Sequence, residues 1–166
     1  MRNTLIATAF LLLASTSAAL AAMTVTLGAP WDGVTVPAGQ QCKHDRGGKS
    51  ATPPMAVSGL PAGTAQVVVA FNDRDYPPLS KNGGHGTIGF AVSGPKAVLP
   101  PVPGHTKKMP VGAVVVARAK STGSYATPGY LPPCSGGKKH RYFAIVSAVD
   151  AAGKTLEQVT VELGKY

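Results

Sequence analysis

Carboxylate, imidazole and phenol side chains gather in three short polar segments, and each segment lies at one end of an apolar run. The segments cover residues 72–77, 83–86 and 132–142, and they contain Asp73, Asp75, His85, His140 and Tyr142. Loops at strand ends are where a rigid sheet can direct such groups at a ligand. Imidazole and phenol groups can donate hydrogen bonds to an oxyanion, and a carboxylate can accept one from a ligand. The three segments therefore predict a site built by loops.

Simpler roles stay open for each of these residues. An aspartate after a strand can cap the turn in which it lies, and a single histidine is more often packed or exposed than bound to a ligand. An acid and base set of Asp73, His85 and His140, with Ser135 nearby in the sequence, would instead make the protein a weak hydrolase. The sequence contains no nucleophile motif with an oxyanion-hole turn, which favours binding over catalysis.

Metal chemistry has little support in the sequence. Zinc sites usually combine closely spaced cysteines and histidines. The only cysteines are Cys42 and Cys134, and the four histidines are scattered without ligand spacing. We therefore expect neither a metal nor another cofactor.

The first 21 residues have the pattern of a secretory signal peptide. Arg2 gives a positive start, residues 5–14 are almost entirely apolar, and Ala19 and Ala21 are small residues at the positions that a signal peptidase reads. The apolar run is shorter than the roughly 20 residues that span a bilayer, and no later segment is apolar for long enough. These features predict cleavage after Ala21, no transmembrane segment, and a periplasmic or secreted protein.

Cleavage would leave 145 residues, 22–166, which is the size of one ordinary domain. Removing Arg2 leaves 15 basic and 7 acidic residues, so the formal charge falls from +9 to +8. This charge favours anionic partners, although a basic solvated surface is an equally good interpretation. Nucleic acid is not expected, because such surfaces usually interleave aromatic residues with the charges and only 6% of this chain is aromatic.

The two cysteines predict a disulfide, because an exported chain meets an oxidising compartment. A Cys42–Cys134 bond would close a loop of about 93 residues and stabilise the fold by roughly 4 kcal/mol in the chain-entropy model. Two buried free thiols are the alternative.

Apolar stretches of strand length, separated by Gly and Pro, favour a mostly antiparallel β-sandwich. The expected strands cover residues 24–27, 65–71, 87–92, 111–117, 141–149 and 158–163. The stretches 66–71 and 113–117 lack clean alternation, as do central strands covered on both faces. Residues 151–158 could form one or two helical turns.

Several motifs occur in an order that is more specific than any one of them. A strand ends in Asp-x-Asp-x-Pro at 73–77, Gly84-His85 follows, Gly129-Tyr130 precedes Pro-Pro-Cys at 132–134, and His-Arg-Tyr at 140–142 opens an apolar strand. The segments TPPM at 52–55 and SGLPAGT at 58–64 also fit. Together, over roughly residues 42–150, they resemble the phosphatidylethanolamine-binding protein family, especially its bacterial Raf-kinase-inhibitor-like branch.

The resemblance implies a two-sheet fold with a small pocket at one end that accepts phosphate-like groups and phospholipid headgroups, and a non-catalytic role. By position it assigns six residues to this pocket: Asp73, Asp75, His85, Tyr130, His140 and Tyr142. Arg141 is left out, because neighbouring residues on a strand point to opposite faces. Family members also act by occluding proteins, so a module that inhibits a protease or kinase is the alternative.

The sequence departs from the family pattern at several places, including Val57, where the family has a tryptophan nearby. Arg74 replaces a proline between the two aspartates, and Gly86 replaces a bulky aromatic residue beside the pocket histidine, which predicts a more open pocket wall. The family has a helix between its penultimate and final strands, whereas only residues 151–163 lie there in this chain. We therefore expect the C-terminal helix to be reduced or absent.

Overall fold

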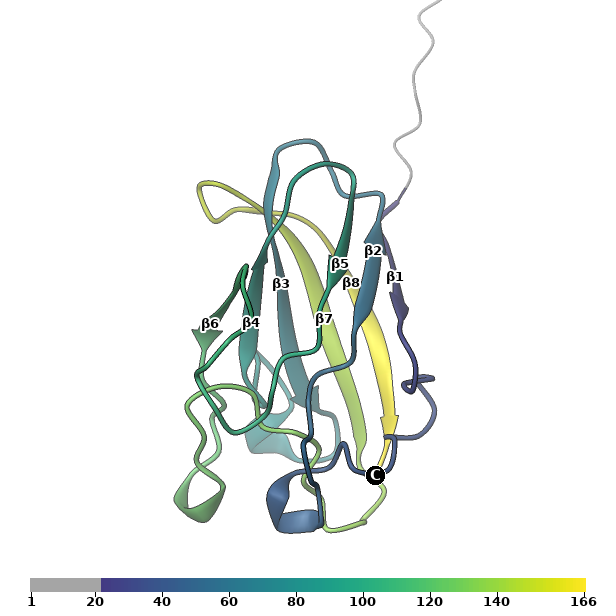
Figure 1. Cartoon of the computed structure of the whole chain (residues 1–166), viewed down its shortest axis with the longest axis vertical. Coiled ribbons are helices and arrows are strands. Elements are labelled where there is room, and N and C mark those ends of the chain that lie inside the picture. Colours follow the sequence, from purple (N-terminus) through teal and green to yellow (C-terminus); the bar gives the residue numbers. More distant parts are fainter. Residues whose placement is uncertain (1–21) are drawn as a thin grey trace, which may run out of the picture.

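The computed structural model describes residues 22–166, which form two antiparallel β-sheets packed face to face (Figure 1). The expected signal peptide, residues 1–21, lies outside the described residues. The regular structure consists of eight strands and three short 3-10 helices, and residues 22–166 contain no α-helix. The expected β-sandwich is confirmed. No helix in this part of the chain has the length and apolar character needed to cross a membrane.

The strands divide into a sheet of three and a sheet of five. The smaller sheet has the order β1-β2-β5, with bounds Thr24–Leu27, Met55–Ser58 and Lys96–Leu99. The larger sheet has the order β6-β4-β3-β7-β8, with bounds Ala113–Ala117, Thr87–Ala91, Thr64–Asp73, Arg141–Asp150 and Thr155–Lys165.

The core lies between the two sheets and depends on the alternation of buried and half-buried residues along 67–71 of β3 and 144–148 of β7. Val67, Val69 and Phe71 of β3 are buried, and Val146 of β7 is buried opposite Val69. Each buried aliphatic or aromatic side chain contributes about 1.5 to 3 kcal/mol through removal of apolar surface from water. The facing side chains of the smaller sheet belong to the same cluster: Met55, Val57 and Leu99.

The pairing of β3 with β7 brings distant parts of the sequence together. The strands run antiparallel from Thr64 opposite Asp150 to Asp73 opposite Tyr142. The end of β3 therefore lies beside the start of β7, and His140 comes just before that start. This register places the first and third polar segments of the sequence at the same end of the sheet.

All six expected strands are confirmed. Two further short strands were not predicted, and one expected strand has a different place in its sheet. β2 and β5 were missed, and residues 113–117 form an edge strand rather than a central one. β6 has a neighbour on one side only, and Val114 and Val116, which share one face of this strand, are each 51% exposed. Residues 151–158 contain a turn and the start of β8, not helical turns, so the C-terminal helix is absent as expected.

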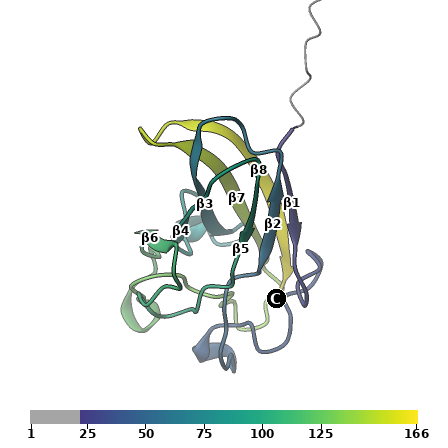
Figure 2. The same cartoon turned by 45° about the horizontal axis from the view of Figure 1, so that its top comes forward.

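The loops that carry the polar segments gather at one end of the sandwich. The 3-10 helices η1 (Lys43–Asp45), η2 (Pro77–Leu79) and η3 (Gly123–Tyr125) lie at this end, which is the lower end in Figure 1. Figure 2 shows the same loops, in a second view, at the end away from the turn between β7 and β8. The expected disulfide between Cys42 and Cys134 is confirmed, with a Cα–Cα distance of 5.2 Å, and it joins the η1 loop to the 132–140 loop.

Candidate functional site

A cavity of about 500 Å³ lies among these loops, and we call it the loop cavity. Buried residues, Asp73, Leu79, His85 and Leu131, form its floor. The remaining lining residues are Tyr76, Pro78, Lys120, Ser121, Thr122, Tyr125, Cys134, Ser135, Lys138 and His140. The floor of the cavity thus combines apolar, imidazole and carboxylate groups, and its rim adds phenol, hydroxyl and ammonium groups.

The loop that carries His85 is bound to the end of β3 by main-chain and side-chain hydrogen bonds. His85 N–H donates to Phe71 O at 2.9 Å, and Phe71 N–H donates to Gly86 O at 3.0 Å. The Asn72 Oδ1 atom accepts from Gly83 N–H at 3.0 Å and from Gly84 N–H at 3.2 Å. Asn72 is therefore a positioning residue, and sequence reasoning did not single it out.

His85 is buried, and its contacts define which ring nitrogen carries the proton. Its Nδ1 lies 2.8 Å from Leu131 O. Because a carbonyl oxygen only accepts, Nδ1 donates and holds a hydrogen. Burial lowers the pKa of His85 and favours the neutral ring, so Nε2 is an acceptor. This Nε2 atom is buried without a hydrogen-bond partner among the described residues.

Asp73 orients the second histidine. His140 Nδ1 donates to Asp73 Oδ2 at 2.7 Å, and Asp75 N–H donates to Asp73 Oδ1 at 2.9 Å. Asp73 is thus both a turn cap and the partner of an imidazole, so the two roles open at the sequence level coexist. The bond fixes the ring of His140 and leaves its Nε2 available to a ligand.

The two tyrosines lie behind His85, not in the loop cavity. The Tyr142 ring meets the His85 ring edge-on at a centroid distance of 5.4 Å, and its hydroxyl accepts from Cys134 N–H at 3.1 Å. Tyr130 packs on Phe71 at 4.7 Å. Both phenols are buried, and burial raises the pKa of each. They support the floor of the cavity, with Tyr142 steadying both His85 and the 132–140 loop.

Comparison with known proteins gives a match to one family. The sequence profile described as phosphatidylethanolamine-binding protein matches residues 28–165. The chain belongs to the phosphatidylethanolamine-binding protein family. A search of the curated proteins finds no significant match.

Two solved structures show the same fold. One is Escherichia coli YbcL, described as a new member of the mammalian family, with a TM-score of 0.58, 21% identity, and coverage of 88% of this chain and 98% of YbcL. The other is CT736 of Chlamydia trachomatis, described as a putative phosphatidylethanolamine-binding protein homologue. It has a TM-score of 0.57, 22% identity, and coverage of 87% of this chain and 97% of that protein.

Asp75 lies outside the loop cavity in this family member. Its carboxylate pairs with Arg141, with Nε to Oδ2 at 3.0 Å, and accepts from Arg141 N–H at 2.7 Å. The Arg141 guanidinium lowers the pKa of Asp75 through these bonds. Arg141 is exposed and, as expected, does not line the cavity. This ion pair ties the β3 turn to the start of β7.

Arg74, which departs from the family pattern, also points away from the cavity. Its guanidinium pairs with Glu162 and lies 4.3 Å from the centroid of the Phe143 ring. Phe143 and Glu162 lie opposite one another on β7 and β8. Arg74 therefore contacts the outer face of the sheet and does not line the loop cavity.

From the sequence we expected Gly86 to leave the wall of the cavity open. In the structure the wall is closed at this residue. The main chain of residues 129 and 130 packs directly against it: a Cβ atom at Gly86 would lie 2.8 Å from Gly129 O and 3.1 Å from Tyr130 Cα. Its φ of 107° also favours glycine. The backbone of the Gly129-Tyr130 segment fills the space that a side chain would take.

The cavity rim contains residues that sequence reasoning did not assign to the site. Lys120 and Lys138 bring ammonium groups, and Tyr76 and Tyr125 are 48% and 44% exposed. Lys120 Nζ donates to Lys81 O at 3.2 Å, which holds its charge near the cavity. The only sequence signal for this rim is the lysine content of the loops.

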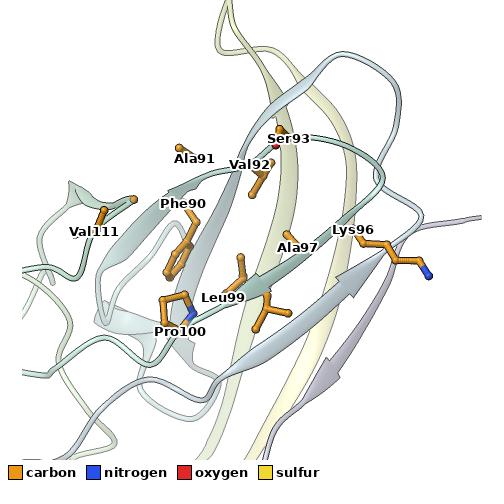
Figure 3. A pocket seen from close by; sticks show the side chains of 11 residues that line it. Phe90, Ala91, Val92, Ser93, Lys96, Ala97, Leu99, Pro100 and Val111 are labelled. Carbon is orange, nitrogen blue, oxygen red and sulfur yellow. The ribbon is translucent and has the colours of Figure 1, made fainter.

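A second hollow and a cysteine cluster do not offer comparable chemistry. The hollow, of about 230 Å³, lies between β4, β5 and the turn before β6, and apolar side chains surround it (Figure 3). Lys96 is its only charged lining residue. Among the described residues, Cys42, Asp45 and Cys134 form the one group with metal-ligand proximity, but the two sulfurs are joined in the disulfide.

Proposed function

We propose that this family member is an exported, non-catalytic protein that binds a small phosphate-containing ligand in the loop cavity. The observation that carries the proposal is the convergence of His85, His140 and Asp73 on one cavity whose rim includes Lys120 and Lys138. Imidazole and ammonium groups are suitable partners for phosphate oxygens. A phospholipid headgroup or a free phosphate ester would supply these phosphate oxygens.

The charge of the surrounding loops supports an anionic ligand. Exposed lysine and arginine residues are frequent in the loops at this end of the sandwich: Lys43, Arg46, Lys49, Lys81, Arg118, Lys120, Lys138 and Lys139. The turns at the far end include only Lys96 and Lys154. Such an asymmetry raises the local concentration of anions and orients their approach.

The surroundings of Ser135 support binding over hydrolysis. A serine nucleophile needs an adjacent base that takes its proton. The Ser135 hydroxyl instead donates to the main-chain oxygen of Tyr166 at 2.5 Å. The disulfide and the N-terminal sequence pattern support export to an oxidising compartment.

Titration of the isotope-labelled protein tests the proposal. We expect inorganic phosphate and phosphoethanolamine to give saturable NMR shifts at His85, His140 and neighbouring amides. His140→Ala should weaken binding at least about tenfold, because it removes a charge-assisted hydrogen bond. His105→Ala is the matched control, since His105 does not line the loop cavity.

Three results would contradict the proposed function. One is the absence of saturable binding by either ligand. Another is unchanged binding in a folded His140→Ala variant. The third is multiple turnover of a phosphate ester by the purified protein, which would revive the hydrolase interpretation.

A further inference from the structure

We propose that the free edge of β6 is a docking surface for an extended, acidic peptide segment of another protein, which pairs with this strand and extends the five-stranded sheet. The proposal goes beyond the proposed function, because no residue of β6 lines the loop cavity. It rests on three features that the loop cavity leaves unexplained: an unpaired strand edge, exposed valines beside it, and positive charges at both of its ends.

The main chain of β6 offers hydrogen-bonding groups on its free side. In the described part of the chain β6 pairs with β4 alone, and it forms one edge of the larger sheet (Figure 1). Just before β6 begins, Ala91 N–H donates to Gly112 O at 2.9 Å. Because such bonds alternate along an antiparallel pair, the main-chain groups of Val114 face β4 and those of Val115 face outward. An extended chain can bond to these outward groups and add a strand to the sheet.

Apolar side chains accompany this edge. Val114 and Val116 are each 51% exposed on one face of β6, and Val111, in the turn before the strand, is fully exposed. Val111 and the exposed Val98 also line the apolar hollow of about 230 Å³ beside this turn (Figure 3). A strand with alternating aliphatic residues would cover the valines of β6, and the hollow gives room for an apolar side chain at the end of that strand.

Positive charge lies at both ends of the edge, and the surrounding sequence lacks negative charge. Two lysines precede β6 and two further cations follow it, all of them exposed: Lys107, Lys108, Arg118 and Lys120. All seven acidic residues of the chain lie outside residues 76–149. Among the described residues, none of the four cations forms an ion pair. A strand with acidic residues at its ends would place them beside these cations.

The same charges disfavour a second copy of this chain as the occupant. Antiparallel pairing of β6 with β6 of another copy would bring residues 107–108 of one copy beside residues 118–120 of the other. Parallel pairing would set each cation beside its own counterpart. Like charges directly across a strand pair are destabilising, and basic residues beside an edge are a usual protection against such self-pairing. The edge therefore favours a strand of opposite charge.

Hydrogen exchange and a synthetic peptide test the proposal. The probe is the peptide EEVTVTVEE, and KKVTVTVKK is its control with the same apolar centre. We expect the acidic peptide to bind saturably at low salt, at least about tenfold more tightly than the basic peptide, and to lose affinity as salt rises. When the acidic peptide is bound, the Val115 amide should exchange at least about tenfold more slowly. The Val114 amide, which already bonds to β4, should change little.

Two substitutions examine the main-chain edge and its charge separately. Val115→Pro removes the outward N–H, which an edge strand tolerates, and should weaken binding of the acidic peptide at least about tenfold. Lys108→Glu should weaken this binding about threefold or more. Lys154→Glu is the matched control and should have no effect, because Lys154 lies in the turn between β7 and β8. If Val115→Pro fails to fold, the comparison of Lys108→Glu with Lys154→Glu decides.

The outcomes separate this surface from the loop cavity and from a second copy. Peptide binding should be unchanged by inorganic phosphate, and NMR shifts confined to the loop cavity and reversed by phosphate would overturn the proposal. Equal affinities for the two peptides, or no protection of Val115 at millimolar acidic peptide, would also overturn it. Protection of Val115 that grows with protein concentration alone, with dimers in sedimentation, would assign the edge to a second copy instead.

Discussion

The Nδ1 atom of His140 lies 2.7 Å from the Oδ2 atom of Asp73, although the two residues are 67 positions apart in the sequence. The contact depends on the pairing of β3 with β7, which sets Asp73 opposite Tyr142. Asp73, the last residue of β3, thereby orients the imidazole of His140, which comes just before the neighbouring strand β7. The sheet thus positions a hydrogen-bonded pair at the cavity before any ligand arrives.

Replacing this aspartate should change anion preference more than anion affinity. Asp73→Asn removes the negative charge beside the ligand and substitutes an amide that can donate as well as accept. We therefore expect the ratio of phosphate to sulfate affinity to fall by about tenfold, measured by calorimetry. Asp75→Asn is the matched control, because Asp75 faces Arg141 outside the cavity. An unchanged ratio in Asp73→Asn would contradict the role assigned to its carboxylate.

Because His85 is buried, we expect the folded protein to lose stability in mild acid. Burial lowers its pKa in the folded state, so below about pH 6.5 the unfolded chain binds a proton that the folded chain does not. Stability therefore rises with pH in this window and falls on acidification, with a slope of up to about 1.4 kcal/mol per pH unit from this residue. The titratable groups around His85 are Asp73, Tyr130, His140 and Tyr142.

Denaturant unfolding between about pH 5 and 8 measures this slope. The difference between the wild-type protein and His85→Asn isolates the His85 contribution from that of His105, whose pKa burial also lowers. Parallel stability curves for the two proteins across this range would be the contrary result.

Gly86→Ala should destabilise the fold and disturb the cavity. An added methyl group would lie 2.8 Å from Gly129 O at a φ of 107°, so either the main chain moves or strain is stored. We expect a loss of about 1 to 3 kcal/mol. Gly63→Ala is the matched control, since Gly63 also has a positive φ of 85° but no neighbouring atom within 4 Å. Equal losses in thermal or denaturant unfolding would show that the contact with residues 129 and 130 has no effect.

The disulfide should matter for stability and for the cavity. Cys42 and Cys134 are 92 residues apart, and removing so long a cross-link is expected to cost about 2 to 5 kcal/mol. Cys134 also lines the cavity, and the bond ties η1 to its wall. A Cys42→Ala/Cys134→Ala variant should unfold at lower denaturant concentration and bind phosphate more weakly. Full retention of both properties would contradict this role.

The sequence was sufficient to predict the long strands and the residues at their ends. The apolar stretches of β3 and β7 are unmistakable, and the polar segments that follow or precede them place Asp73 and His140 at loop positions. β5 was missed because it is four residues long and lies between Pro95 and Pro100. β6 was assigned a central place because its valine run resembles a buried strand, and edge position depends on pairing partners that a sequence does not display.

Depth within the site could not be predicted from spacing alone. Alternation along the chain groups His140 with Tyr142, but only the packing of the Tyr142 ring against His85 shows that the tyrosine lies behind the cavity. Asp75 was assigned to the pocket because the resemblance matches it to the family's Asp-x-Asp turn, and its carboxylate instead pairs with Arg141. Lys120 was not found because it comes from the long connection between β6 and β7, whose path no local pattern specifies.

The most direct test of the proposed function is a crystal structure of the protein grown with inorganic phosphate. The account predicts a phosphate in the loop cavity, with one oxygen within hydrogen-bond distance of His140 Nε2. The Asp73 to His140 contact should persist. An empty or water-filled cavity, with phosphate bound only at surface lysines, would contradict the assignment of this cavity as the binding site.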